Sequence, residues 1–284
     1  MHFLSFTWNA DDVLFQIGPI AIHYYSLMFV IAFSLGYYIM KKIYNNEKVP
    51  LEYLDTLFIY VVVATLLGAR LGEVFFYSWD YYKDHMVEIL LPIREAPGKS
   101  IFGFIEGYEF TGFRGLASHG AAIGIIVGMF LYRRKYQYKS IMWILDRVVI
   151  PVACGAIFVR LGNFFNSEIV GKPTNSNFGI IFEKLGEDFP RHPAQLYESF
   201  GYIFVFSILY YLYWKTDKKD KPGYLFGTFL VLLWTVRFFV EFVKESQGGF
   251  ESSLGNILST GQWLSIPFIA LGIFMMMRAN KKIV

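Results

Sequence analysis

Long apolar blocks alternate with short polar connections along this chain. Seven such blocks lie at about 20–40, 53–77, 116–133, 141–160, 197–214, 224–244 and 261–278. A helix needs about 20 residues to cross the roughly 30 Å hydrocarbon core of a bilayer. Apolar runs of this length satisfy their backbone in lipid only as helices. The pattern therefore predicts an all-α integral membrane protein with seven transmembrane helices in a single polytopic membrane domain, residues 1–284.

Basic residues in the short connections set the predicted orientation. They follow the first, third and fifth blocks and close the chain: Lys41, Lys42 and Lys48; Arg133, Arg134, Lys135 and Lys139; Lys215, Lys218, Lys219 and Lys221; Arg278, Lys281 and Lys282. Short loops with excess Lys and Arg stay in the cytoplasm. Seven spans then place the N-terminus outside and the C-terminus inside. Asp146 and Arg147 interrupt the fourth block, and we expect them in its first, cytoplasmic turns.

Two of the predicted outer segments, 78–115 and 161–196, are long and rich in Gly, Pro, Asn and aromatic residues. Segments of this length with such composition form structure of their own more often than simple loops. We expect them to build a small extracytoplasmic head. The remaining outer segments are the tail 1–19 and residues 245–260.

Composition narrows the function classes. The chain is 55% hydrophobic and carries a formal net charge of only +3, which gives no indication of a nucleic-acid partner. Its one cysteine, Cys154, permits no internal disulfide and is expected to fill space within the fourth span. The first eighteen residues read as a short tail and not as a cleaved leader. No phosphate-binding or dinucleotide-binding glycine motif is present, and we expect neither a cofactor nor a metal.

Three further arginines of the apolar blocks lie toward the outer face: Arg70, Arg160 and Arg237. Placing an arginine inside the bilayer costs about 3 kcal/mol by the lower estimates. Each of these arginines therefore needs a partner, a cavity or an anionic ligand. Structural explanations are open for all three. Arg237 with Glu241 and Arg70 with Glu73 have helical ion-pair spacing, and the Arg160 side chain could extend to the interface.

Other polar residues are predicted at the same face. His23 and Tyr25 begin the first block, although one or both neighbouring tyrosines fit an aromatic belt. His119 opens the third block among small residues. Pro193 precedes the fifth block, where Gln195 and Glu198 fit a first helical turn.

Guanidinium groups bind phosphate in a bidentate manner and stay charged in a low dielectric. Several of them at the outer membrane face therefore predict a site for the head group of an outer-leaflet phospholipid, with a histidine nearby.

The ordered motifs of the chain resemble those of bacterial prolipoprotein diacylglyceryl transferases. The most specific is Gly162-Asn163-Phe164 with Arg160 ahead and Asn166, Glu168 and Gly171 following. The other matching blocks, in chain order, are His23-Tyr24-Tyr25-Ser26-Leu27-Met28, Ala69-Arg70-Leu71-Gly72, Ser118-His119-Gly120, His192-Pro193-Ala194-Gln195-Leu196-Tyr197-Glu198, Arg237 with Glu241-Phe242, and Gly261-Gln262-Trp263-Leu264-Ser265-Ile266-Pro267. The resemblance spans residues from about 20 to 270.

The resemblance implies a reaction and its partners. Such enzymes move the diacylglyceryl group of phosphatidylglycerol onto the lipobox cysteine thiol in the signal peptide of a preprolipoprotein. A thioether forms, glycerol 1-phosphate leaves, and lipoprotein maturation begins. The family also has seven spans with the N-terminus outside, so we expect the bacterial cytoplasmic (inner) membrane and an active site open to the outer leaflet and its membrane lipids.

The resemblance also implies roles for individual residues. Arg160 and Arg237 match arginines expected to bind the lipid phosphate and to stabilise its charge as it departs. His119 matches a proposed general base for the thiol. The remaining phospholipid-binding candidates are Tyr25, Asn163, Glu168, Gly171 and Arg70, and those of a second tier are His23, Gln195 and Glu241.

The sequence departs from the family pattern at Ala121, Leu233 and Glu73, where a glycine, a tyrosine and an aromatic residue are expected. Other seven-span proteins fit less well. A retinal protein needs a lysine in its last span, and residues 261–277 contain none. A transporter would place ionisable groups near the midplane. Another phospholipid head-group transferase would share the arginine cluster and is the main alternative.

Overall fold

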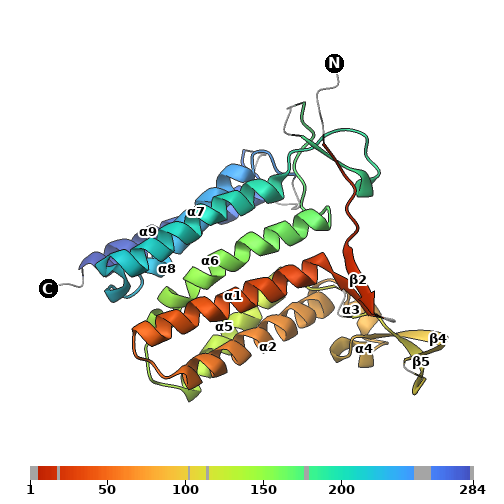
Figure 1. The fold of residues 1–284 in the computed structure, drawn as a ribbon, viewed down its shortest axis with the longest axis horizontal. Helices are drawn as coiled ribbons and strands as arrows, with labels where there is room; N and C mark the ends of the chain where they lie inside the picture. Colours follow the sequence, from red (N-terminus) through yellow and green to blue (C-terminus); the bar gives the residue numbers. More distant parts are fainter. Residues whose placement is uncertain are drawn as a thin grey trace. The chain divides into compact units, whose positions relative to one another are not determined.

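The structure is a computed structural model that describes residues 6–17, 20–101, 103–112, 115–175, 179–245 and 257–281. It is mostly helical (Figure 1). A helix lies over each of the seven apolar blocks: α1 Tyr24–Asn46, α2 Leu51–Phe76, α5 Ser118–Lys135, α6 Ile141–Phe165, α7 Ala194–Lys215, α8 Tyr224–Val240 and α9 Thr260–Lys281. Four of them, α1, α2, α6 and α9, are long and apolar enough to cross a membrane, and α8 is apolar but shorter, with 17 residues.

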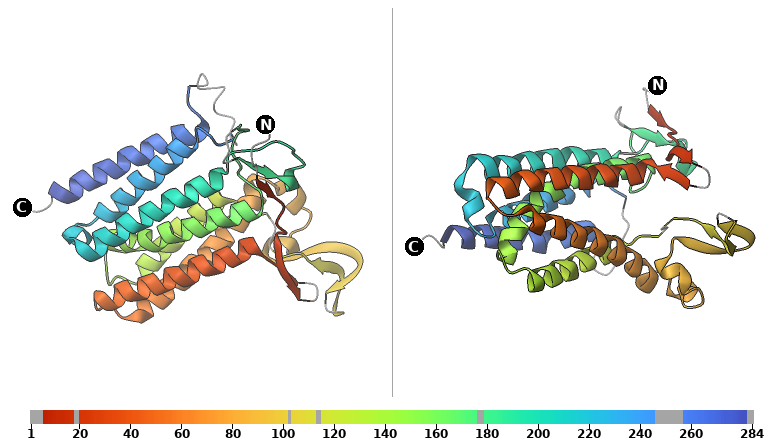
Figure 2. Two further views of the ribbon diagram at one scale, coloured as in Figure 1. Left: turned by 45° about the horizontal axis from the view of Figure 1, so that its top comes forward. Right: turned by 60° about the horizontal axis from the view of Figure 1, so that its bottom comes forward.

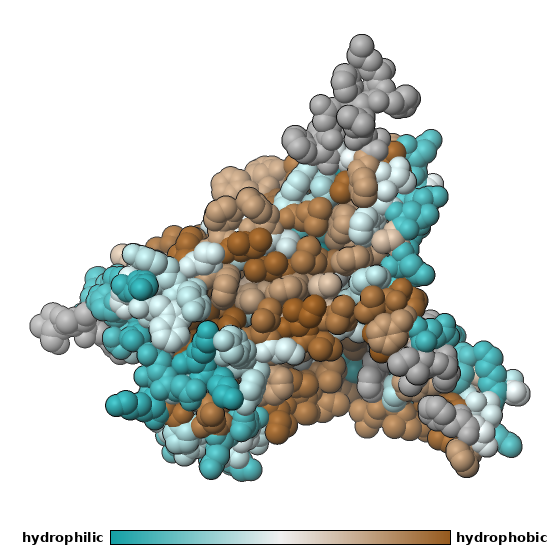
Figure 3. All heavy atoms as spheres, viewed as in Figure 1, coloured by the Kyte–Doolittle hydropathy of each residue, from teal (hydrophilic) through white to brown (hydrophobic). Residues whose placement is uncertain are grey.

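The helix ends follow from local chemistry. Pro50 and Pro193 stand immediately before α2 and α7, where a missing N–H costs nothing. Gly223 precedes α8 with φ of 90°, a conformation that L side chains rarely adopt. Apolar side chains cover the helices along their middle in the face drawn in Figure 3, and hydrophilic ones gather toward the helix ends. This distribution is what a bilayer requires.

Contacts divide the chain into two compact units. Unit 1 comprises Met1–Ile17, Ala21–Ile43 and Met142–Val284, and unit 2 comprises Gly18–Ile20 and Tyr44–Ile141. Each is described separately below.

Unit 2 is built on a close crossing of α2 and α5. A Cβ added to Gly72 would lie 2.5 Å from the Cα of Gly120, and one added to Gly68 would lie 2.8 Å from the Cα of Gly124. Backbones approach this closely only where side chains are absent, as in glycine-mediated packing of membrane helices. Beyond the end of α2 lie two short helices, α3 Trp79–Tyr82 and α4 Val87–Leu90. The antiparallel hairpin of β4 Ile93–Ile101 and β5 Ile105–Phe110 follows, and Figure 2 shows it projecting from them.

Unit 1 contains α6 and the helices α7, α8 and α9, of which α8 packs against both α7 and α9 (Figure 2). Asp146 in α6 accepts hydrogen bonds from the backbone N–H groups of Gly223 and Phe226, at 2.7 and 2.8 Å. Arg147 donates to the carbonyl of Lys219 at 3.0 Å. The first turns of α6 therefore hold the connection between α7 and α8, which contains the 3₁₀ helix η2 Asp217–Asp220.

At the other end of these helices, unit 1 has short strands. The parallel pair β1 Phe6–Trp8 and β6 Ile180–Phe182 packs on a cluster of Phe164, Val170 and Phe182, with the 3₁₀ helix η1 Glu183–Leu185 following β6. Strands β2 Val13–Ile17 and β3 Ile20–His23 pair ahead of α1. The expectation of an all-α fold omitted these strands and the β4–β5 hairpin. Of these pairings, that of β1 with β6 joins segments distant in sequence, whereas β2–β3 and β4–β5 join neighbouring segments of the chain.

Candidate functional site

A chain of polar contacts begins at the end of α6. Arg160 Nη1 donates to Asn163 Oδ1 at 3.0 Å, and Asn163 Nδ2 donates to Glu168 Oε1 at 2.6 Å. Asn163 is 3% exposed. Because Arg160 and Asn163 are three residues apart, they share one face of the helix. The signature motif thus joins an arginine to a glutamate through a buried amide.

The loop after α6 holds Glu168 in a fixed place. Ser167 and Ile169 on either side of it have positive φ of 56° and 61°. A β-branched residue in this region is strained, and such strain persists only where surrounding contacts impose it. Here the Glu168 N–H donates to the carbonyl of Asn163 at 3.0 Å, and Gln195 Nε2 donates to the carbonyl of Glu168 at 2.7 Å.

Glu198 connects the loop end of α6 with the end of α8. Its carboxylate forms ion pairs with Arg160 Nε and, at 4.0 Å, with Lys244 Nζ. Glu198 is 1% exposed, so both charges interact in a dry environment. The contacts are ion pairs and not directed hydrogen bonds, since neither carboxylate oxygen has a hydrogen-bond partner among the described residues. Tyr202, one turn along α7, lies close enough to interact with Arg160 and Glu198.

Arg237, in the last turn of α8, has no such carboxylate partner among the described residues. Its guanidinium carbon lies 5.0 Å from the ring centroid of Trp234, a cation–π arrangement. Its buried Nε has no hydrogen-bond partner among the residues that the structure describes. The ion pair of Glu241 is with Lys244 Nζ, at 3.7 Å. The helical pair of Arg237 and Glu241 that the spacing allowed is therefore not the contact that the structure forms.

Gly171 lies where the segment after α6 passes the end of α8. A Cβ there would be 2.5 Å from the carbonyl oxygen of His192 and 2.7 Å from that of Val243. Gly171 also bridges to Lys244 in an antiparallel manner. Because residue 171 is a glycine, three backbone segments can meet here. The bridge to Gly171 positions the backbone of Lys244, from which its side chain extends.

Arg191 supports this meeting point from outside. It donates to both oxygens of Glu187, to Glu245 Oε2 at 2.8 Å and to the carbonyl of Gly171 at 3.1 Å. The Arg191 guanidinium lowers the pKa of Glu187 below its usual value. The pairing with Glu187 raises the pKa of Arg191 in turn. The sequence reasoning missed this network, because its hydrogen bonds join residues up to 54 positions apart.

Tyr25 and Glu241 are placed by glycines. The Tyr25 ring packs on Gly162, where an added Cβ would lie 2.7 Å from its Cδ2 atom. The Glu241 carboxylate packs on Gly261, where an added Cβ would lie 2.6 Å from both carboxylate oxygens. Of the predicted site residues, the structure thus places Tyr25, Arg160, Asn163, Glu168, Gly171, Gln195, Arg237 and Glu241 in unit 1.

His23 is also in unit 1 but belongs to a separate surface link. Its Nδ1 lies 3.2 Å from Asp12 Oδ2, and Lys184 Nζ donates to Asp12 Oδ1 at 3.1 Å. The bond from Lys184 lowers the pKa of Asp12 below its usual value. This link joins the strand region before α1 to η1.

Arg70 and His119 lie in unit 2. Arg70 is 6% exposed and donates from Nε to the carbonyl of Ile89 at 3.0 Å and from Nη2 to that of Glu88 at 2.5 Å. Its guanidinium carbon is 4.7 Å from the centroid of the Tyr82 ring. Arg70 therefore anchors α4 to α2. His119 is exposed in the first turn of α5.

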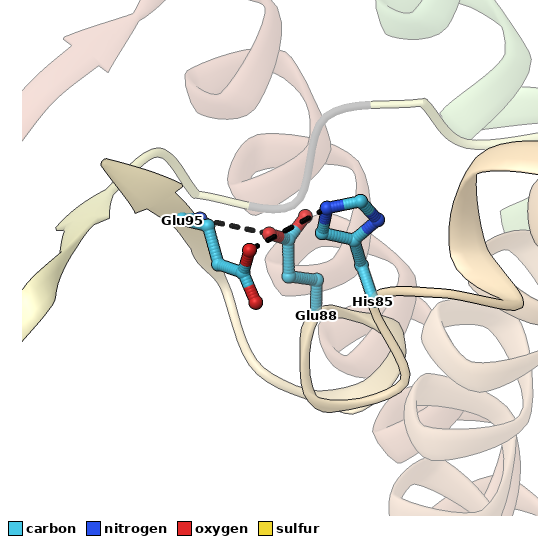
Figure 4. A group of neighbouring side chains, drawn as sticks. All are labelled: His85, Glu88 and Glu95. Atoms are coloured by element: carbon cyan, nitrogen blue, oxygen red, sulfur yellow. Dashed lines mark hydrogen bonds and ion pairs between the residues drawn. The ribbon is translucent and has the colours of Figure 1, made fainter. Parts of the chain in front are cut away.

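Among the residues that the structure describes, His85, Glu88 and Glu95 in unit 2 form a group that could hold a metal ion, with one ligand atom of each within 4.8 Å of the others (Figure 4). The Glu88 carboxylate already accepts hydrogen bonds from Tyr81 Oη and from the Glu95 N–H, both at 2.8 Å. A hydrogen bond with the carbonyl of Tyr81 raises the pKa of His85. These bonds join the hairpin to α4, and this internal role accounts for the group.

Sequence reasoning assigned Glu198 only to a first helical turn and did not single out Lys244, Tyr202 or Trp234. The three-residue spacing of Glu241 and Lys244 was the one local signal for Lys244. The contact between Glu198 and Arg160 joins different helices, and no spacing in the sequence indicates it.

Unit 1 thus combines membrane-length helices with a cluster of two partly buried arginines, a buried lysine and two buried glutamates, the arrangement of a membrane protein that handles an anionic ligand. The sequence matches the family described as "Prolipoprotein diacylglyceryl transferase" over residues 12–278. The chain belongs to that family, which confirms the resemblance seen in its motifs.

Three relatives are each named "Phosphatidylglycerol--prolipoprotein diacylglyceryl transferase". The chain is 41% identical to the protein of Tolumonas auensis over 275 residues, which cover 97% of this chain and 98% of the relative. It is 40% identical to the protein of Bacteroides fragilis over 279 residues, covering 98% and 97%. For Chloroherpeton thalassium the identity is 39% over 275 residues, covering 97% and 94%.

Proposed function

We propose that this chain transfers the diacylglyceryl group of phosphatidylglycerol to the lipobox cysteine thiol of a preprolipoprotein, the first step of lipoprotein maturation. Relatives with this activity in their names match nearly the full length of the chain. No rearrangement of domains separates it from them, so the same reaction is the simplest assignment.

The observation that carries the proposal is the Nε donor of Arg237, which has no acceptor among the described residues, whereas the neighbouring cations of unit 1 pair with carboxylates. A buried N–H donor without an acceptor is costly unless a ligand supplies one, and the Nε of Arg237 is such a donor among the described residues. Two further buried polar atoms near Glu168 lack partners among the described residues: Ser167 Oγ and Gln195 Oε1. The phosphodiester of a lipid head group offers oxygen acceptors to Arg237 Nε. The glycerol hydroxyls of the head group can donate to Ser167 Oγ and Gln195 Oε1.

The chemical step is a displacement at carbon. The cysteine thiolate forms a carbon–sulfur bond to the glyceryl carbon that carries the phosphate, and the carbon–oxygen bond to that phosphate breaks. Glycerol 1-phosphate leaves with the bonding electron pair and one additional negative charge. Guanidinium groups placed before the reaction stabilise this charge without reorganisation, an effect worth about 3–4 kcal/mol for a single donor in other enzymes.

His119 is proposed as the base that takes the thiol proton. This assignment rests on its match to the family histidine and on its exposure in the first turn of α5. A thiol with an ordinary pKa of about 8.5 is mostly protonated at neutral pH, so a base increases the thiolate fraction. The His119→Gln variant should lose activity most near pH 7 and least near pH 9. An unchanged pH–rate profile would remove His119 from this role.

For the membrane arrangement, we propose seven spans in the bacterial inner membrane, the N-terminus outside, the C-terminus in the cytoplasm and the site facing the outer leaflet. The contacts within unit 1 support this arrangement. Asp146 and the basic connection between α7 and α8 lie at one end of the helices, whereas Arg160, Glu198 and Lys244 lie at the other. Basic loops stay cytoplasmic, so the site belongs to the outer side. The outer segments 78–115 and 161–196 then form the extracytoplasmic head.

The remaining candidates are proposed to shape the site. Tyr25, Asn163, Glu168, Gly171 and Gln195 position Arg160 and the loop after α6, and Arg70 supports the outer part of unit 2. The proposed partners are phosphatidylglycerol, the lipobox signal peptide and surrounding membrane lipids.

The decisive experiment is a transfer assay with purified protein, phosphatidylglycerol and a lipobox peptide in detergent micelles. We expect the mass of one diacylglyceryl group on the peptide cysteine and an equal amount of released glycerol 1-phosphate. A matched peptide with serine in place of cysteine is the control. Turnover of the lipid with transfer to another acceptor, and none to the thiol, would identify a different head-group transferase.

A further inference from the structure

Lys244 is a buried lysine in unit 1 that the family motifs above leave without a role. It is 6% exposed and follows α8. Its ammonium lies 3.7 Å from Glu241 and 4.0 Å from Glu198, distances that suit an ion pair but exceed a normal hydrogen bond. An ammonium has three N–H donors, and burial makes each one costly if it has no close acceptor.

Arg160 has a different environment. It pairs closely with Glu198 and donates to Asn163, so two sides of its guanidinium are already occupied by the protein. Arg237 is held by the Trp234 ring and keeps its Nε free of described acceptors. Lys244 lies close enough to both arginines for their charges to act on it. The three cations therefore belong to one cluster, but they are not equally available to a ligand.

We propose that Lys244 is a third phosphate-binding residue, which together with Arg237 grips the lipid phosphate while Glu198 positions Arg160. The proposal rests on the proposed function and deepens it. Glu198 is then a positioning residue, because it acts on the lipid through Arg160 and Lys244.

The charges of the cluster favour this division. The described ion pairs match Arg160 and Lys244 with Glu198 and Glu241, so the charge of Arg237 is the one that no described ion pair matches with a carboxylate. A lysine ammonium on a flexible stem can also follow the phosphate as it becomes a dianion. The carboxylates hold Lys244 loosely enough for a phosphate oxygen to enter at hydrogen-bond distance.

The alternative is that Lys244 only neutralises Glu198 and Glu241. The two roles differ in what they do to lipid affinity. A neutralising lysine supports folding and the position of Arg160, so its loss lowers stability and kcat. A phosphate ligand also sets KM for phosphatidylglycerol and the affinity for glycerol 1-phosphate.

The test compares Lys244→Met, Lys244→Arg and the control Lys172→Met in the full-length protein. Lys172 is nearby but exposed, and its ammonium donates to the carbonyl of Phe242. We would measure KM for phosphatidylglycerol in mixed micelles, inhibition by glycerol 1-phosphate, and thermal unfolding. Unfolding can be followed with a thiol-reactive dye, because the only cysteine, Cys154, is buried until the protein opens.

In Lys244→Met we expect KM and the inhibition constant of glycerol 1-phosphate to rise together by about tenfold to hundredfold, the range for loss of a hydrogen bond to a charged group. Lys244→Arg should stay within about threefold of the wild type, since it keeps the charge and donors. Lys172→Met should match the wild type. A lower kcat and lower stability with both constants unchanged would overturn the proposal.

If Lys244→Met does not fold, Lys244→Gln gives the same test, because its amide can still donate to a carboxylate. Raised constants support the phosphate role, and unchanged ones contradict it. A wild-type protein that labels no lipobox peptide would refute the proposed reaction. Stabilisation of that protein by glycerol 1-phosphate, lost in the Lys244 variant, would still support the anion site.

Discussion

Arg70 in unit 2 and Arg237 in unit 1 are both arginines of apolar helices, but their donors are used differently. Arg70 donates hydrogen bonds from Nε and Nη2 to the backbone carbonyls of Ile89 and Glu88. Arg237 has an aromatic ring beside it and an Nε without a described acceptor. Burial and charge alone therefore do not distinguish an anchor from a ligand-binding residue. The two kinds of arginine are distinguished by which N–H donors remain without an acceptor after folding.

The largest effect is expected at the arginines of unit 1. Arg160→Ala or Arg237→Ala should lower kcat/KM for transfer by about a hundredfold to a thousandfold, as for other donors that face developing charge. The thermal midpoint of Arg237→Ala should stay near that of the wild type, because no described ion pair holds this side chain and its Nε has no described acceptor. Transfer assays beside Cys154 unfolding curves would show both. Wild-type rates in the Arg237 variant would contradict its assignment to phosphate.

The Arg70→Met variant tests the other arginine of the comparison, the one that anchors α4 to α2. Removing the guanidinium leaves two carbonyls of α4 without donors, so we expect a loss of about 2–4 kcal/mol in the free energy of unfolding. KM for phosphatidylglycerol, measured well below the new midpoint, should change little. A large rise in KM with unchanged stability would mean that Arg70 also binds the lipid and that the two arginines are alike.

The glycine crossing of unit 2 should be the next most sensitive feature. Gly72→Ala puts a Cβ 2.5 Å from the Cα of Gly120, which forces the helix backbones apart. Overpacking of this kind costs about 1–3 kcal/mol. Gly36→Ala in α1 is the matched control, because its nearest neighbour is the Pro151 Cβ at 3.5 Å, an ordinary contact. Equal midpoints for the two variants would show that α2 and α5 are not packed through these glycines.

How much the sequence could predict differs between helices and contacts. The apolar blocks identified seven helices, and their ends differ from expectation by up to six residues. Asn46 ends α1, which was expected to end near 40, and Phe165 ends α6, which was expected to end near 160. The pairing of β1 with β6 was not predictable, because the two strands are more than 170 residues apart. Pairing between such distant segments leaves no local period in the sequence.

The site shows the same difference. The motif residues Arg160, Asn163 and Glu168 are linked within eight positions, so spacing could bring them together. Glu198 joins them from α7 and Lys244 from the segment after α8, and the anchor role of Arg70 depends on carbonyls 18 and 19 residues away. Spacing could suggest Glu73 as the partner of Arg70, but only the tertiary structure shows that backbone carbonyls receive its donors.

The smallest effect is expected at the surface support of unit 1. Because Arg191 lowers the pKa of Glu187, the pair stabilises the folded segment at pH values above the ordinary 4.5 of a glutamate. That stability is lost as the pH falls through the lowered pKa. The partly exposed pair is worth no more than about 1 kcal/mol after solvent screening. Limited proteolysis between pH 7 and pH 3 should show residues 179–193 becoming more accessible in the wild type. Glu187→Gln should remove most of this pH dependence, and an unchanged profile would exclude the pair as its source.

A structure with bound phosphatidylglycerol tests the central claim most directly, through the distance from the phosphate oxygens to Arg237. We expect at least one oxygen within about 2.7–2.9 Å of a guanidinium nitrogen of Arg237, the length of a charge-assisted bond, while Arg160 keeps its contact with Glu198. A lipid phosphate bound elsewhere, with Arg237 Nε turned to a protein carboxylate, would contradict the account.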